Sequence, residues 1–174
     1  MDTIVDYEYK IDGTITTIAA NLDSTWTVTY DPLPDDVDSE LPQFTAATLS
    51  GVMSDFGVYL MRMDSRFYTD LLAQINESFK TYITNPRGLD IEFSGLLLAS
   101  IHCNETNCTY DLYQTLQGNY VAVITNRTDR FDWNHWENMD LERQKLAVRS
   151  WMGSSTGAKA LYSVVGISCS VILK

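Results

Sequence analysis

The two histidines and the carboxylates beside the second of them are the residues best suited to metal chemistry. His135 lies among Asp132, Glu137 and Asp140 in a short run of the chain. Carboxylate oxygens and an imidazole could hold a hard cation, which would support a small metal-dependent hydrolase. The run matches no zinc or calcium motif, however, and acidic side chains are also typical of a helix start, where they cap free N–H groups. We predict no metal site here and keep the hydrolase as an alternative function.

The chain contains no recognisable arrangement for nucleophilic catalysis. His102 and Cys103 are neighbours on a predicted strand, so their side chains should face opposite sides of it. No Gly-x-Ser-x-Gly motif occurs, and the segment 153–159 lacks the glycine and lysine spacing of a phosphate-binding loop. We therefore predict a protein without catalytic residues or a cofactor, and not an enzyme.

The three cysteines permit at most one internal disulfide. Cys103 and Cys108 are separated by four residues, a spacing that would place them opposite each other across a hairpin. Because no signal peptide is visible and Cys169 is left over, we expect three reduced thiols. The alternative is a secreted or surface glycoprotein module with a Cys103–Cys108 disulfide. Four Asn-x-Ser/Thr acceptor sites would fit it, although we interpret them mostly as chance matches: Asn76, Asn104, Asn107 and Asn126.

Charge is distributed very unevenly along the 174 residues. Residues 1–58 hold 11 acids and one base (net −10), whereas residues 59–174 hold 12 acids and 11 bases (net −1). An acidic surface argues against specific nucleic-acid binding, which needs lysine and arginine at the phosphates. It would suit a solubilising face, or a face that lines a DNA conduit without holding the DNA. No apolar run is long enough to predict a membrane span.

One amphipathic helix over about 65–84 is the predicted centre of the fold. Apolar side chains recur there every four residues, as a helix with one buried face requires: Phe67, Leu71, Ile75, Phe79 and Ile83. A second helix is predicted at about 139–152. A shorter helix over 44–56 and a strand over 58–63 are expected before the central helix. A flexible joint at 153–157 and a closing strand over 161–173 are expected at the end of the chain.

Alternating apolar and polar residues predict two antiparallel meanders. The first comprises strands over 4–11, 14–22 and 25–30, with a hairpin at Asp12-Gly13. The second comprises strands over 89–93, 96–101, 108–116 and 120–125, with a bulge at Gly95. The expected fold class is α+β: two meanders forming a sheet or sandwich, packed by the two helices, in a single domain over 1–174.

The candidate interaction residues lie in an acidic, proline-rich arm and among the tryptophans. The arm at about 31–43 has the composition of a flexible loop, and we predict that neighbouring subunits hold it. Tryptophan is favoured where protein surfaces meet. The set comprises Asp31, Asp35, Asp36, Asp38, Glu40, Trp133 and Trp136.

The predicted function is a non-enzymatic structural subunit of a multi-copy assembly. Its expected partners are further copies of itself, in a ring or lattice, and neighbouring structural proteins. The most concrete expectation is a virion component, such as a tailed-phage connector, tail-terminator or tail-tube ring protein. A virion location is therefore expected, and a cytoplasmic one otherwise.

Overall fold

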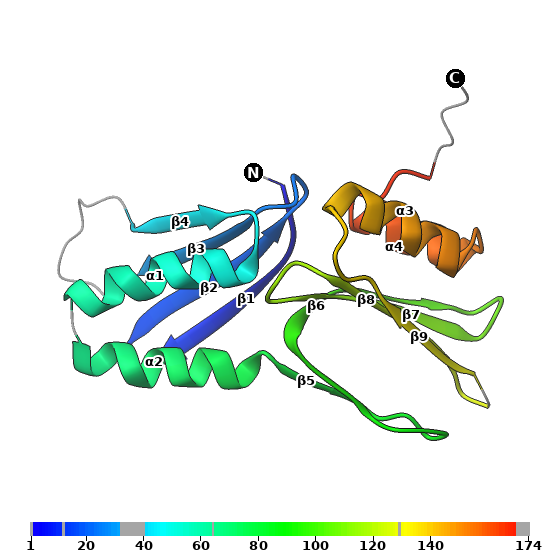
Figure 1. Cartoon of the computed structure of the whole chain (residues 1–174), viewed down its shortest axis with the longest axis horizontal. Helices are drawn as coiled ribbons and strands as arrows, with labels where there is room; N and C mark the ends of the chain where they lie inside the picture. Colours follow the sequence, from blue (N-terminus) through cyan, green and yellow to red (C-terminus); the bar gives the residue numbers. More distant parts are fainter. Residues whose placement is uncertain (1, 12, 32–40, 64, 129, 170–174) are drawn as a thin grey trace. The chain divides into compact units, whose positions relative to one another are not determined.

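The computed structural model describes residues 2–11, 13–31, 41–63, 65–128 and 130–169, with the backbone alone for 65–68. Two antiparallel sheets and four helices form this part of the chain, so the predicted α+β class is confirmed. The chain divides into two compact units, Met1–Lys80 and Thr81–Lys174 (Figure 1). The assignment of residues 1–174 to one domain stays a prediction.

The first unit contains a four-stranded sheet with strand order β1-β2-β3-β4. Its strands are β1 (Thr3–Ile11), β2 (Thr14–Asn21), β3 (Trp26–Asp31) and β4 (Gln43–Ala46). The three predicted strands of the first meander are confirmed. Gly13 turns the chain between β1 and β2 with a φ of 85°, a conformation that glycine adopts without steric cost.

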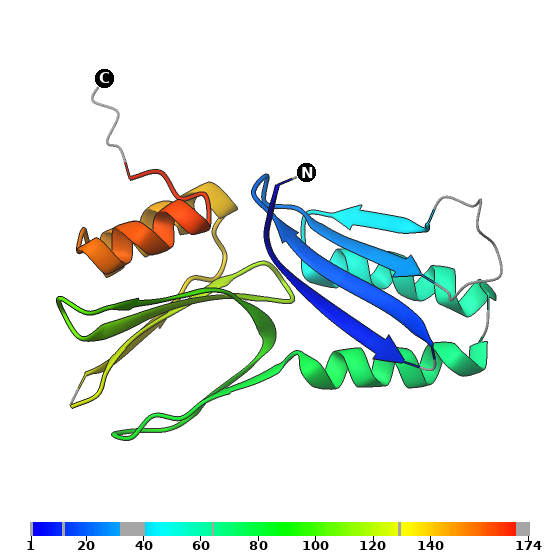
Figure 2. The same cartoon turned by 180° about the vertical axis from the view of Figure 1, so that it is seen from behind.

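Helices α1 (Leu49–Met63) and α2 (Ser65–Ser78) pack against one face of this sheet (Figures 1 and 2). The alternation along β3 places Trp26, Val28 and Tyr30 on the covered face and Thr27 and Thr29 on the other. On β2, Ile18 and Ala20 share the covered face with the buried Thr16. Both helices bury their apolar stripes against each other or against the sheet. The fully buried side chains of this core include Ile18, Trp26, Val28, Phe56, Leu71, Ile75 and Phe79.

Two predictions before α2 need correction. The helix expected over 44–56 is confirmed from Leu49 onward, but Phe44 belongs to β4. The expected strand over 58–63 was wrong, because these residues form the second half of α1. Thr48 marks the true helix start, because its hydroxyl accepts a hydrogen bond from Gly51 N at 3.1 Å. Leu60 continues the buried helical spacing of Phe56, which keeps the chain helical to Met63.

The central helix ends earlier than predicted. The expected helix over 65–84 is confirmed only as α2, because Lys80–Ile83 forms strand β5. Thr81 Oγ1 donates a hydrogen bond to Gly95 O at 3.1 Å, so this segment joins the second sheet. Its β-branched and aromatic residues favour that extended conformation.

The second unit contains a five-stranded sheet with strand order β5-β6-β7-β8-β9, curved into a half-barrel. The further strands are β6 (Ile91–Cys103), β7 (Cys108–Thr115), β8 (Tyr120–Asn126) and β9 (Phe131–His135). The predicted strands over 108–116 and 120–125 are thus confirmed. Those over 89–93 and 96–101 belong to the single strand β6, and β9 was not predicted.

Two features of β6 account for the curvature. A bulge interrupts its register with β7 between Leu97 and Ala99, close to the predicted position. At Gly95 an added Cβ would lie 2.4 Å from Gln114 O, so the backbones approach too closely for any side chain. The bulge and the glycine together let β6 bend and carry β5 around the sheet.

Helices α3 (Leu141–Met152) and α4 (Thr156–Val164) cover the convex face of the half-barrel, on the side away from β5 (Figures 1 and 2). Helix α3 confirms the predicted helix over 139–152, with Asp140 as its N-cap. The core beneath both helices includes Leu112, Ile124, Val148, Leu161 and Tyr162.

The expectations for the end of the chain were wrong. The predicted joint at 153–157 contains the start of α4, whose N-cap Ser155 accepts a hydrogen bond from Ala158 N at 3.2 Å. Gly157 packs so tightly that an added Cβ would lie 2.7 Å from Cys103 Cβ. Within the predicted strand over 161–173, residues 161–164 are helical, 165–169 form no strand, and 170–174 lie outside the described residues.

The acidic arm is only partly described. Asp31 ends β3 and Gln43 begins β4, while residues 32–40 lie outside the described residues. Tyr30 N donates to Pro42 O at 3.1 Å, so the chain rejoins the sheet directly after the arm.

Candidate functional site

The face of the half-barrel opposite α3 and α4 is here called the inner face, and polar, aromatic and apolar side chains from β6 to β9 lie on it. Strand register defines two rows of residues across it. One row is Ser100, Asp111, Val123 and Trp133, and the next is Leu97, Tyr113, Val121 and His135. Residues along each row pair across neighbouring strands and therefore share this face.

Aromatic rings mark both sides of the inner face. Trp133 and His135 stack on β9 with ring centroids 5.6 Å apart and planes inclined by 17°. Phe93 and Tyr113 meet edge to face on β6 and β7, with centroids 5.4 Å apart. Such contacts hold the rings in fixed orientations.

A single carboxyl group lies within these two rows. Burial raises the pKa of Asp111, and a hydrogen bond with the Ser100 side chain opposes that rise. The environment thus disfavours the ionised form, and the neighbouring hydroxyl compensates for part of the lost hydration.

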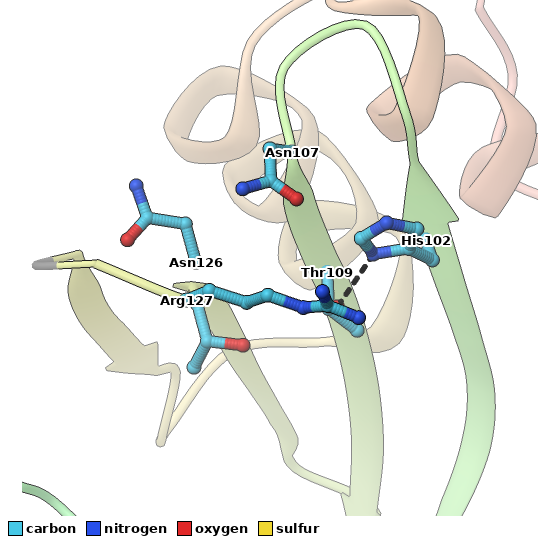
Figure 3. Close-up of a pocket in the computed structure, with 6 residues that line it drawn as sticks. His102, Asn107, Thr109, Asn126 and Arg127 are labelled. Carbon is cyan, nitrogen blue, oxygen red and sulfur yellow. Dashed lines mark hydrogen bonds between the residues drawn. The ribbon is translucent and has the colours of Figure 1, made fainter.

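A polar pocket of 270 Å³ lies at the end of the β6–β7 and β8 strands, one row beyond Ser100 and Asp111 (Figure 3). His102, Thr109 and Thr125 form its floor as paired residues of three adjacent strands. His102 Nδ1 lies 3.1 Å from Thr109 Oγ1, within hydrogen-bonding distance. The remaining lining residues come from the two adjoining turns: Asn107, Asn126 and Arg127.

Hydrogen bonds hold the turn that carries Arg127. Asn126 N donates to Arg130 O at 3.0 Å, and Asn126 Oδ1 accepts from Thr128 N at 3.1 Å and from Arg130 N at 2.8 Å. From this turn the Arg127 side chain extends across the pocket toward β7 (Figure 3). The pocket therefore combines one guanidinium with uncharged polar groups and an imidazole.

The structure separates the carboxylates that were considered as metal ligands. Asp132 pairs with Arg130 at 2.6 Å, Glu137 lies 3.5 Å from His135 Nε2, and Asp140 caps α3. Within the described residues, no three histidine, cysteine or acidic side chains are placed to share a metal ion. Each of these carboxylates has a local structural role.

The two tryptophans predicted as interaction residues have different environments. Trp133 is 41% exposed on edge strand β9, whereas Trp136 is 8% exposed and meets Trp151 edge to face with centroids 6.0 Å apart. Asp31 is half-buried at the end of β3, and Asp35, Asp36, Asp38 and Glu40 lie outside the described residues. A role for these residues in an interface stays a prediction.

Cys103 and Cys108 form the last pair of the β6–β7 ladder, as their spacing predicted. Both thiols are buried and unbonded to each other. Cys108 Sγ donates to Thr106 O at 3.3 Å, and hydrogen bonds from Thr106 lower the pKa of Cys103. His102 points away from this pair, toward the pocket, as expected for adjacent residues of a strand.

Sequence reasoning missed the pocket because its residues come from two turns and three strands. The one available signal was the four-residue loop between Cys103 and Cys108, which fixes the pairing of His102 with Thr109. Across the described part of the chain, no helix combines the length and apolar character needed to cross a bilayer. Comparison of the chain with known protein families, with curated proteins and with solved structures gave no significant match.

Proposed function

We propose that this chain is a non-enzymatic structural subunit of a multi-copy assembly, in which edge strand β9 of one copy pairs with edge strand β5 of the next. The most concrete form of the proposal is a virion component, such as a tailed-phage connector, tail-terminator or tail-tube ring protein. Within the described residues, no strand pairs with the outer edge of β9, and this edge with its exposed Trp133 carries the proposal.

An unpaired edge strand presents a row of backbone N–H and C=O groups that can pair with another chain. Proteins that stay monomeric usually protect such edges with short strands, charged side chains, proline or a bulge. Strand β9 contains no proline, its pairing with β8 runs without a register shift, and its acidic residue, Asp132, pairs with Arg130. Strand β5 carries a lysine, Lys80, at its first position alone. The edge of β9 is therefore the better suited of the two to pair with a further strand.

Exposed aromatic side chains lie on both outer strands of the half-barrel. Trp133 is 41% exposed on β9, and Tyr82 is 64% exposed on β5. Large aromatic side chains on a surface bury much area on association with little loss of entropy. Two different surfaces that recognise each other give a head-to-tail contact, and repetition of that contact forms a ring or a filament.

The charge distribution supports different roles for the two units in such an assembly. The first unit holds 14 acids and 4 bases (net −10), and the second holds 9 acids and 8 bases (net −1). The second unit is nearly neutral, so two copies can meet through it with little repulsion between like charges. The acidic first unit suits a surface that DNA passes without binding.

Mass photometry and light scattering of the purified chain, from dilute to concentrated solution, test this proposal. We expect species larger than a dimer. Trp133→Lys and Tyr82→Lys should each prevent assembly, because each disables one of the two surfaces. Mixed together, the two variants should form a dimer and nothing larger, since each keeps the surface that the other lacks. Leu146→Lys, on α3 and 56% exposed, is the matched control and should assemble as the parent chain does.

Two outcomes would overturn the proposal. A parent chain that remains monomeric at every concentration would exclude self-association. A Tyr82→Lys variant that still dimerises alone would show that copies meet through a single self-complementary surface and not through β5 and β9.

A further inference from the structure

In the part of the chain that the structure describes, Arg127 has no acidic partner, although the protein is strongly acidic; Asp129, two positions further along the same turn, lies outside that part. Several other bases of the second unit form ion pairs: Arg130 with Asp132, Arg143 with Asp140, and Lys145 with Glu142. Among the residues that the structure describes, no carboxylate pairs with Arg127, and none lines the pocket into which it extends. With 23 acids against 12 bases in the chain, a described lining with one guanidinium and no carboxylate departs from the acidic charge of the protein.

The other lining groups can donate hydrogen bonds to the same ligand. Arginine offers five N–H donors in a planar fork, an asparagine amide offers two, and each threonine hydroxyl offers one. Asn107 is held at the pocket by a turn in which its φ is 49°, and Thr109 and Thr125 form the floor. These donors come from β7, β8 and two turns, so they surround a ligand instead of lying in one plane.

We propose that this pocket binds the phosphate group of a small molecule. The two oxygens of a carboxylate would engage only part of these donors, whereas the oxygens of a tetrahedral phosphate point in several directions and can use them together. A water molecule occupies about 30 Å³ in the liquid. The pocket of 270 Å³ therefore holds a phosphate with room for part of the molecule attached to it.

This site is independent of the proposed assembly contacts. The pocket lies at the β6–β7 turn and the end of β8, and its lining includes no residue of β5 or β9. A chain that fails to assemble could still bind phosphate, and an assembled chain could fail to bind it.

Titration of the ¹⁵N-labelled chain with inorganic phosphate, at constant ionic strength and pH, tests the proposal by NMR. We expect saturable shifts confined to the amides of residues around the pocket. A lone phosphate ion should bind with a dissociation constant on the order of millimolar, since it makes a few charge-assisted hydrogen bonds. Sodium acetate under the same conditions should produce much weaker shifts.

Arg127→Gln should weaken phosphate binding roughly tenfold or more, because it removes the charged donor. Thr109→Val should weaken binding to a smaller extent, because it removes one hydroxyl. Arg87→Gln, an exposed arginine in the turn before β6, is the matched control and should leave binding unchanged.

Three results would overturn the proposal. Phosphate could cause no saturable shift at the pocket, acetate could bind as tightly as phosphate, or both Arg127→Gln and Thr109→Val could retain full affinity while keeping the parent spectrum elsewhere. Because Arg127→Gln and Thr109→Val change different lining residues, one of them still tests the proposal if the other alters the fold.

Discussion

Tyr120 N donates a hydrogen bond to Gln144 Oε1 at 2.8 Å, which ties the start of β8 to the first turns of α3. Gln144 Nε2 donates to Met139 O at 3.0 Å, so one buried amide serves both the strand and the segment before the helix. Because both the oxygen and the nitrogen of the Gln144 amide are hydrogen-bonded, this buried side chain favours one position of α3 on the sheet.

Gln144→Leu should destabilise the second unit by about 1–3 kcal/mol, because the buried N–H of Tyr120 loses its acceptor. The free energy of unfolding in urea, followed by the fluorescence of the tryptophans, measures this change. Glu142→Gln, exposed on the same helix, should have little effect by comparison. Equal stability of Gln144→Leu and the parent chain would show that another group satisfies the Tyr120 N–H.

Asp111→Asn should stabilise the chain at neutral pH and have little effect in acid. Burial raises the pKa of Asp111 in the folded state, so the fold disfavours the ionised carboxylate. The stabilising contribution of protonated Asp111 to the free energy of unfolding is fully present below the ordinary aspartate pKa of about 3.9. It is lost as the pH rises through the higher pKa that Asp111 has in the folded state. Asparagine cannot ionise, and its advantage should therefore grow over that pH interval.

Urea unfolding of both proteins at a series of pH values tests this dependence. Ser100→Ala provides a second test. It removes the hydrogen bond between Ser100 and Asp111 that lowers the pKa of Asp111, so this pKa should rise further. NMR titration of the Asp111 carboxyl carbon reads that shift directly. An advantage of Asp111→Asn that is independent of pH would contradict the explanation by burial of charge.

Gly95→Ala should cost about 1–3 kcal/mol, the usual range for forcing extra atoms into a packed site. The added Cβ would meet Gln114 O at 2.4 Å and Thr115 Cα at 2.8 Å, and backbone atoms cannot rotate away as side chains do. Gly51→Ala is the matched control, because the atoms nearest to its Cβ belong to side chains, the closest being Thr48 Oγ1 at 3.0 Å. Urea midpoints that are equal for both variants would show that β6 can bend without Gly95.

The strands of the two meanders were the most predictable part of the fold, whereas the strand predicted over 161–173 is not formed by residues 161–169. Val28 and Ile18 lie on the buried face, as the period of two requires. Boundaries between helix and strand were less predictable. Tyr82 and Ile83 fit the apolar stripe of a longer helix equally well, and only pairing with β6 assigns them to a strand.

The end of the chain shows how tertiary packing decides an ambiguous sequence. Residues after Gly153 resemble a flexible joint by composition, yet Gly157 is required where α4 approaches Cys103 and Tyr110. Arg127 and His102 likewise come together only through the pairing of three strands. No local periodicity brings Arg127 and His102 together, so the pocket could not be predicted from the sequence. The helical spacing of Ala158, Leu161, Tyr162 and Val165, in contrast, does indicate α4, and the predicted joint and strand overlooked it.

Oxidation should join Cys103 to Cys108. The two residues are direct partners in the β6–β7 ladder, and hydrogen bonds from Thr106 lower the pKa of Cys103, which favours its thiolate. With glutathione disulfide as oxidant, the Cys103 thiolate attacks one sulfur and releases a glutathione thiolate. Cys108 then attacks the mixed disulfide at Cys103 and releases the second glutathione, leaving an internal disulfide.

In the Cys169→Ser variant, which lacks the exposed third thiol, mass spectrometry after oxidation should find a mass lower by two hydrogen atoms, with Cys103 and Cys108 in one cross-linked fragment. The urea midpoint should rise, because the bond restricts the unfolded chain. Cys169→Ser should leave the reaction unchanged, whereas Cys108→Ser should stop it at the glutathione adduct of Cys103. A stable adduct at Cys103 in the parent chain would show that the Cys108 thiol cannot reach the mixed disulfide from the opposite strand.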